Sequence, residues 1–247
     1  MAVPARVSLL CLPCAGASAM MYLRWRPLLP RWIEIVPVEL PGRGMRMGEC
    51  FVESFDAQVA RICAEQADAM QGSFMLFGHS MGALLAYGVA QRLRAQGRPL
   101  PRALLASGSS APSQRDPGRL PGTHDDAALT AELRKQGGTP EEVFASAELM
   151  RITLDTLGAD YRVCRSFAYA ADALLPMPLH VFAGRRDDIN APRMEAWSAH
   201  AGDAFTLDWF DGGHFFIRQR EAAFLDALTR RVSQAMDGGR HAPHAVA

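Results

Sequence analysis

Short uninterrupted hydrophobic runs alternate along the chain with longer stretches of mixed polarity. Such runs are typical of strands that are buried on both faces of a parallel sheet. The run at 33–38 is rich in β-branched residues, and the Leu40-Pro41-Gly42-Arg43-Gly44 segment behind it has the composition of a turn. We expect strands at residues 7–12, 33–38, 74–77, 103–106, 179–182 and 205–209.

Helical candidates lie between these runs. Ser54 is placed to cap a helix whose apolar residues recur every three or four positions. A second candidate runs from Gly82 to Gln96 and is rich in alanine and leucine, with Gly97 as its C-terminal stop. A third runs from Phe215 to Met236. The regular alternation of strand and helix predicts an α/β fold, an open and mostly parallel sheet with helices on both faces.

The alternation breaks between about residues 112 and 175. Several helical pieces, separated at Gly137-Gly138-Thr139-Pro140 and at Gly158, fill this stretch without a convincing strand. A long insertion of this kind in an α/β domain is typical of a lid or binding element. Because the chain has 247 residues, we expect one domain over 1–247 that carries this lid and a disordered tail at about 238–247.

Charge and composition narrow the class of protein. The chain has 26 Lys and Arg against 26 Asp and Glu, so its formal net charge of +0 gives no electrostatic sign of nucleic acid or of an anionic membrane as a partner. No segment offers the roughly 18 apolar residues that a membrane span requires, and the first run is too short for a signal peptide. The five cysteines are therefore expected to be reduced thiols of a cytoplasmic protein.

The segment Gly78-His79-Ser80-Met81-Gly82 matches the G-x-S-x-G pattern of a nucleophile elbow. In such an elbow the chain turns sharply from a strand into a helix, and side chains at the flanking glycines would collide with their neighbours. Here the pattern follows a strand-like run and precedes a helix-like stretch, so Ser80 is the candidate nucleophile. The alternative is a flexible loop of glycine and serine.

A serine hydroxyl needs a base and an orienting acid, and in α/β-hydrolases the order along the chain is Ser, acid, His. His214 is the candidate base because it follows the last expected strand, although a structural role is the alternative. Asp187 and Asp188 follow the strand before it. We favour Asp187 as the acid, because it is the first residue able to fold back after the turn at Gly184, and keep Asp188 as the alternative. In another interpretation, both aspartates cap the next helix. His79 is expected to pack beneath the serine.

An oxyanion needs backbone N–H donors. One is expected from Met81, directly after the nucleophile. The other should come from the loop after the first strand, Pro13-Cys14-Ala15-Gly16-Ala17-Ser18, where we name Ala15. This loop is rich in glycine and alanine, so its backbone can approach a substrate closely.

Several motifs, taken in order, resemble the type II thioesterases, stand-alone editing enzymes of non-ribosomal peptide and polyketide synthesis. The resemblance runs from about Val7 to Met236. The segments that carry it are Leu12-Pro13-Cys14-Ala15-Gly16-Ala17-Ser18, Val38-Glu39-Leu40-Pro41-Gly42-Arg43-Gly44, Phe77-Gly78-His79-Ser80-Met81-Gly82-Ala83, Leu133-Arg134-Lys135-Gln136-Gly137-Gly138-Thr139-Pro140, Gly184-Arg185-Arg186-Asp187-Asp188 and Gly212-Gly213-His214-Phe215-Phe216.

The resemblance implies an α/β-hydrolase fold and hydrolysis of mis-primed or stalled acyl groups from the phosphopantetheine of carrier-protein domains. It implies an acyl-enzyme on Ser80, with Asp187 and His214 at the matching motif positions, a helical lid, and no metal or bound cofactor, since the substrate carries the phosphopantetheine. One departure lies in the oxyanion loop. Relatives often carry an aromatic residue or a histidine before Ala-Gly-Gly, whereas this chain has Cys14 before Ala15-Gly16-Ala17.

Other interpretations remain open at this point. The same triad cleaves oxygen esters, so a small-molecule carboxylesterase or lipase is the alternative enzyme, and a non-catalytic binding protein on a hydrolase scaffold is the alternative class. Cys11 and Cys14 have the C-x-x-C spacing of dithiol redox proteins. Arg43 and Arg46 could meet a phosphopantetheine phosphate, although a solvated surface position or an ion pair is the simpler interpretation.

Overall fold

A single six-stranded sheet forms the centre of the molecule, and every strand pair in it is parallel. The computed structural model describes residues 5–238 except 117, 119, 121, 123, 124 and 172. The expected tail from residue 239 onward therefore lies outside the described residues. The sheet order is β2-β1-β3-β4-β5-β6. The strands are β1 (Val7–Leu12), β2 (Ile33–Pro37), β3 (Phe74–His79), β4 (Leu104–Ser107), β5 (Leu179–Gly184) and β6 (Phe205–Phe210).

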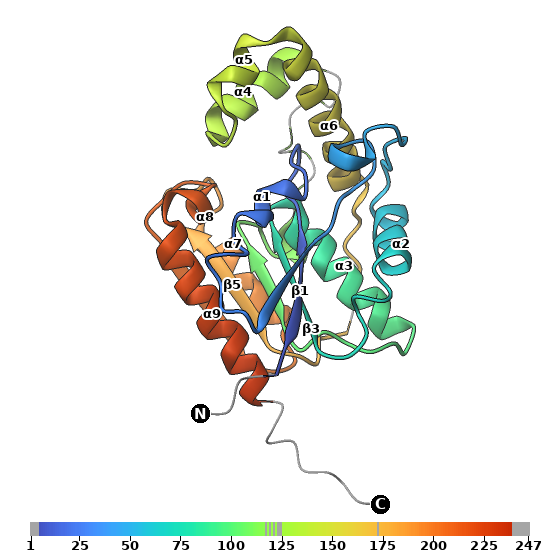
Figure 1. Ribbon diagram of the computed structural model, residues 1–247, viewed down its shortest axis with the longest axis vertical. Helices are drawn as coiled ribbons and strands as arrows, with labels where there is room; N and C mark the ends of the chain where they lie inside the picture. The colour runs from blue at the N-terminus through green and yellow to red at the C-terminus, as the bar shows by residue number, and fades with distance from the viewer. Residues whose placement is uncertain are drawn as a thin grey trace, which may run out of the picture.

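All six expected hydrophobic runs coincide with strands, which confirms the predicted α/β architecture. The runs of the inner strands are nearly continuous because both faces of the sheet are covered there, whereas the edge strands β2 and β6 carry less buried polar residues such as Glu34 and Asp208. Leu10 and Leu12 of β1 join the core on one face, which α2 (Phe55–Glu65) and α3 (Met81–Ala95) cover. Leu9 and Cys11 join the core on the other face, beneath α1 (Met20–Leu23) and α9 (Glu221–Gly238). Figure 1 shows these two layers on either side of the sheet.

Two details of the helices differ from the prediction. Ser54 occupies the N-cap position of α2, but its side chain makes no capping hydrogen bond. The expected terminal helix from Phe215 is divided into α8 (Phe216–Gln219) and α9, because Arg220 leaves helical geometry at φ −127° and ψ 39°. The remaining short elements outside the insertion are η1 (Gly44–Arg46), α7 (Ala191–Glu195) and η4 (Ala196–His200).

The insertion between β4 and β5 forms a helical layer above the carboxyl edge of the sheet (Figure 1). It contains η2 (Pro112–Gln114), α4 (Asp126–Gln136), α5 (Glu141–Ala145) and α6 (Ala147–Ser166). Its helices share a small apolar core of their own that includes Leu129, Leu157 and Tyr161. Gly137 ends α4 in the left-handed conformation, as expected of a separator. Gly158 is not a separator, because it lies inside α6, where tertiary packing overrides its low helix propensity.

Within the part of the chain that the structure describes, no helix has both the length and the apolar character needed to cross a bilayer.

Candidate active site

The chain turns sharply at Ser80 between β3 and α3, as the elbow pattern predicts. Ser80 has φ 57° and ψ −116°, and it is the one residue other than glycine with a positive φ in the described part of the chain. Such a conformation costs on the order of 1–3 kcal/mol and is held by its surroundings. The Ser80 N–H donates to the Ser107 carbonyl at 2.7 Å, which ties the turn to β4. The backbone thus presents the serine side chain above the sheet.

The two glycines of the elbow are required by close contacts between backbones. A Cβ at position 78 would lie 2.0 Å from the carbonyl oxygen of Gly82. A Cβ at position 82 would lie 2.1 Å from the carbonyl oxygen of Leu12, at the end of β1. The glycines therefore let the elbow pack against its own helix and against the loop that follows β1.

Replacing Gly82 by alanine is expected to destabilise the fold, because the added methyl meets backbone atoms that cannot rotate away. We expect the free energy of unfolding to fall by about 1–3 kcal/mol or more, as measured by urea denaturation. Gly48→Ala is the matched control, since a Cβ there meets nothing within 4 Å, and it should change the stability by less than about 0.5 kcal/mol. Equal stability of the two variants would contradict this account of the elbow.

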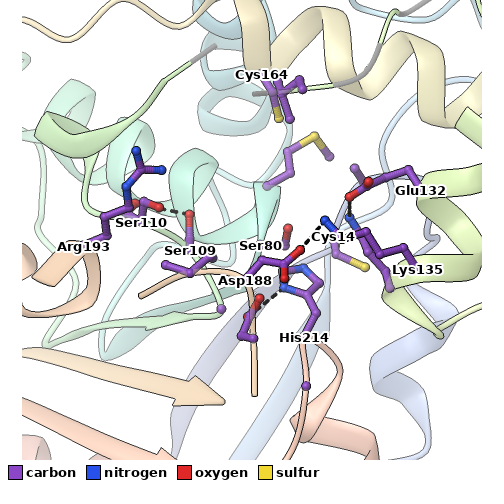
Figure 2. A pocket seen from close by; sticks show the side chains of 18 of the residues that line it. Cys14, Ser80, Ser109, Ser110, Glu132, Lys135, Cys164, Asp188, Arg193 and His214 are labelled. Carbon is purple, nitrogen blue, oxygen red and sulfur yellow. Dashed lines mark hydrogen bonds and ion pairs between the residues drawn. The ribbon is translucent and has the colours of Figure 1, made fainter. Parts of the chain in front are cut away.

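Two of the other candidate residues meet above the neighbouring strands β5 and β6. His214 Nδ1 lies 2.9 Å from Asp187 Oδ2, and the side chains are 13% and 5% exposed. This hydrogen bond leaves Nε2 of His214 buried and without a hydrogen-bond partner among the described residues. Figure 2 shows Ser80 and His214 in the same pocket.

Asp188 pairs with a residue of the lid. Its carboxylate forms an ion pair with Lys135 of α4, and both side chains are more than half exposed, at 65% and 60%. Figure 2 shows this contact at the mouth of the pocket. Neither aspartate caps the next helix, because Asn190 does so by accepting a hydrogen bond from the Arg193 N–H. The geometry thus favours Asp187 over Asp188 as the partner of the histidine.

His79 packs beneath the site, as expected from its place in the elbow. It is fully buried, its Nδ1 lies 2.9 Å from the Ser107 hydroxyl, and its ring centroid lies 5.0 Å from that of His214. Burial, with a smaller contribution from the charge of His214, holds the pKa of His79 well below its usual range. His79 is therefore neutral at pH 7 and adds no second positive charge beneath His214.

A pocket of about 420 Å³ opens above Ser80, His214 and Asp187, and the lid forms one of its walls. The lid contributes Glu132 and Tyr161, among others, while the loop after β4 contributes Ser109 and Ser110 on the opposite side (Figure 2). The pocket also includes both expected oxyanion donors. Met81 and Ala15 line it together with the candidate nucleophile. All five site residues predicted from the sequence, Ser80, Asp187, His214, Met81 and Ala15, therefore line one pocket.

The lid is attached to the loop that carries the histidine. A Cβ at Gly138 would lie 2.3 Å from the ring of Phe215, the residue after His214, so only glycine fits there without displacing that ring. Arg218 Nη1 donates to the Gly138 carbonyl at 2.9 Å. This close approach explains the second glycine of the Gly137-Gly138 pair.

Arg43 forms a buried ion pair and lies neither on a solvated surface nor among the residues that line the pocket. Its guanidinium meets the carboxylate of Asp160 on α6 through two hydrogen bonds of 2.6 and 2.7 Å. Arg46 is likewise paired, with Glu49 and Glu65 at the surface. Sequence reasoning missed Asp160, whose signal is a charged residue within the most apolar stretch of its helix.

The dithiol interpretation finds no support in the surroundings of the two cysteines. Cys11 and Cys14 are both buried free thiols. Burial raises the pKa of the Cys14 thiol to about 12 and that of Cys11 further still. A redox-active cysteine requires a thiol that ionises readily, and these two stay protonated at neutral pH.

Comparison with known proteins places this site in a family. The family model of the thioesterase domain matches residues 7–235. The gramicidin S biosynthesis protein GrsT of Aneurinibacillus migulanus is 32% identical over 92% of this chain and 90% of its own length. Thioesterase PikA5 of Streptomyces venezuelae is 35% identical over 87% of this chain and 76% of its own.

A solved structure extends the likeness to three dimensions. The type II thioesterase BorB from the borrelidin biosynthetic cluster superimposes with a TM-score of 0.84 at 34% identity, over 95% of this chain and 94% of that one. The resemblance first seen in the motifs is thereby confirmed: the chain belongs to the thioesterase family of α/β-hydrolases, among relatives that include type II thioesterases.

Proposed function

We propose that this enzyme hydrolyses acyl thioesters, from mis-primed or stalled intermediates, on the phosphopantetheine arm of carrier-protein domains in non-ribosomal peptide or polyketide synthesis. One observation carries the proposal: a strained serine and a histidine–aspartate pair share a pocket that a helical lid borders. GrsT, a gramicidin S biosynthesis protein, and BorB, from the borrelidin biosynthetic cluster, supply the biosynthetic setting. We also infer one domain and a cytoplasmic setting, in line with the sequence.

The proposed reaction begins with proton transfer. Asp187 accepts the Nδ1–H of His214, which leaves the lone pair of Nε2 free to take the hydroxyl proton of Ser80. The serine oxygen attacks the thioester carbonyl, and the N–H groups of Met81 and Ala15 stabilise the oxyanion. His214 then gives the proton to the departing phosphopantetheine thiolate, which leaves an acyl ester on Ser80.

The second half returns the enzyme to its starting state. His214 removes a proton from a water molecule, whose oxygen attacks the acyl ester, and then returns the proton to Ser80 as the acid departs. Each proton and each charge in this scheme has a partner in the chain. We therefore propose that no metal or bound cofactor takes part, since phosphopantetheine arrives with the substrate.

Release from a loaded carrier protein tests the proposed function. A carrier protein bearing acetyl- or longer acyl-phosphopantetheine is incubated with the enzyme, and the free thiol form is followed by mass spectrometry, with Ser80→Ala as the control. We expect release by the wild type far above the rate of the variant. Equal rates would exclude the thioesterase activity.

Two further readouts separate the alternatives. Faster turnover of simple oxygen esters than of the carrier-bound thioester would favour a carboxylesterase or lipase. A fluorophosphonate probe should form a covalent adduct on Ser80, and failure to do so would favour a non-catalytic binding protein.

A further inference from the structure

The Arg43–Asp160 pair is almost completely withdrawn from solvent. The two side chains are 6% and 3% exposed, and Nη1 and Nη2 of the arginine meet the two carboxylate oxygens separately. Arg43 lies in the loop after β2, whereas Asp160 lies on α6 of the lid. Burying two charges costs several kcal/mol per ion, and apolar replacements of such pairs are often no less stable. Stability alone therefore does not account for the pair.

The Arg43–Asp160 pair also forms hydrogen bonds with a third segment, the loop after β1. The backbone N–H of Gly16 donates to Asp160 Oδ2 at 2.8 Å, and Arg43 Nη1 donates to the Ala17 carbonyl at 3.2 Å. Both contacts reach the loop after β1. Asp160 thus connects the lid helix to the loop that supplies the proposed oxyanion donor, Ala15.

The loop forms a tight turn whose geometry depends on one peptide group. The Ala17 N–H donates to the Cys14 carbonyl at 3.1 Å, which closes a β-turn with Ala15 and Gly16 at its centre. Gly16 has φ 75°, as the third residue of a type II turn requires. Type I and type II turns differ by a flip of the central peptide, which here joins Ala15 to Gly16. The Gly16 N–H that Asp160 binds belongs to that peptide.

We propose that Asp160 is a positioning residue for the oxyanion site. By holding the central peptide of the turn, its carboxylate fixes the backbone of Ala15 and aims the Ala15 N–H at the reacting carbonyl. Arg43 holds the carboxylate in place through both oxygens. Because Tyr161 and Cys164 of the same helix line the pocket, the position of α6 and the order of the oxyanion turn are coupled. This inference rests on the proposed hydrolytic function.

Two double variants separate positioning from stability. Arg43→Met with Asp160→Leu removes both charges and also the acceptor of the Gly16 N–H. Arg43→Met with Asp160→Asn removes both charges but keeps a side-chain oxygen that can accept this hydrogen bond. We call these two double variants the leucine pair and the asparagine pair. We expect kcat of the leucine pair to be about 10- to 100-fold lower than kcat of the asparagine pair, with KM changed less than about threefold. The outright loss of an oxyanion donor costs about 100- to 1,000-fold.

Phosphonylation of Ser80 by a fluorophosphonate keeps this test independent of the proposed substrate, because its phosphoryl oxygen also enters the oxyanion site. The leucine pair should react more slowly than the asparagine pair by a similar factor, while urea denaturation compares their folding. If the two pairs phosphonylate at the same rate, the positioning role is wrong. If the wild type phosphonylates but releases no acyl group from a carrier protein, only the proposed substrate is wrong.

A single variant covers the case in which the leucine pair does not fold. Asp160→Ala leaves space for formate between the guanidinium of Arg43 and the N–H of Gly16. Added formate should restore the rate of phosphonylation in a saturable manner, while chloride at the same ionic strength should not. A rate that is normal without formate, or that formate leaves unchanged, would overturn the proposal.

Discussion

Replacing Ser80 by alanine is expected to lower kcat on a carrier-bound thioester by about 10,000-fold or more. Alanine lacks the oxygen that forms the acyl-enzyme, and His214 then has no hydroxyl from which to take a proton. The residual rate comes from binding and oxyanion stabilisation alone. The measurement is single-turnover release of the acyl group, followed by mass spectrometry, with intact protein mass to detect the acyl-enzyme in the wild type.

Two controls distinguish a loss of catalysis from a loss of folding. Ser80→Ala should keep the stability of the wild type in urea, because the substitution removes one oxygen and leaves the backbone turn in place. Ser198→Ala, which removes a surface hydroxyl that bonds only to the Glu195 carbonyl within the described structure, should keep full activity. An active Ser80→Ala enzyme without any acylated species would overturn the assignment of the nucleophile.

The second large effect distinguishes two adjacent aspartates. Asp187→Asn should lower kcat about 10,000-fold, because an amide can donate to Nδ1 of His214 and thereby stabilise the wrong tautomer. Asp188→Asn changes charge and shape in the same way one residue later, where the carboxylate faces Lys135. We expect it to cost less than about tenfold, since a surface ion pair contributes only about 0–1 kcal/mol.

The ratio of the kcat values of these two variants decides which aspartate is the acid. Both are measured on the same loaded carrier protein at the same pH, together with their urea stability. Comparable losses in both would mean that the loop acts as a unit. Persistent activity of Asp187→Asn with loss in Asp188→Asn would reverse the choice of acid.

The four inner strands, β1, β3, β4 and β5, were predictable because they are buried on both faces and therefore appear in the sequence as nearly continuous apolar runs. The end of the chain was harder to predict. The stretch from Phe215 to Met236 contains neither proline nor glycine, yet the helix breaks at Arg220. Its side chain there bonds to the carbonyl and carboxylate of Asp211. That contact depends on tertiary structure and leaves no local signal.

In the candidate site, too, some residues have a local sequence signal and others depend on tertiary contacts. Ser80, Asp187 and His214 could be placed from sequence because each follows a strand whose carboxyl end faces the same edge of the sheet. The Arg43–Asp160 pair joins residues 117 positions apart, one in a loop and one on a helix, whose packing no local pattern encodes. The choice between a phosphate ligand and an ion pair for Arg43 therefore needed the folded structure.

The position of the lid between two neighbouring strands makes it possible to replace the lid by that of a relative. The lid leaves the sheet after β4 and returns to β5, and these two strands are hydrogen-bonded neighbours, with Ala106 opposite Val181. A transplant of the whole insertion from a relative thus needs only two junctions and disturbs no strand register. The recipient would accept a foreign lid only if that lid brings a carboxylate to the place of Asp160. In chimeras, hydrolytic activity should therefore depend on whether the foreign lid supplies that carboxylate.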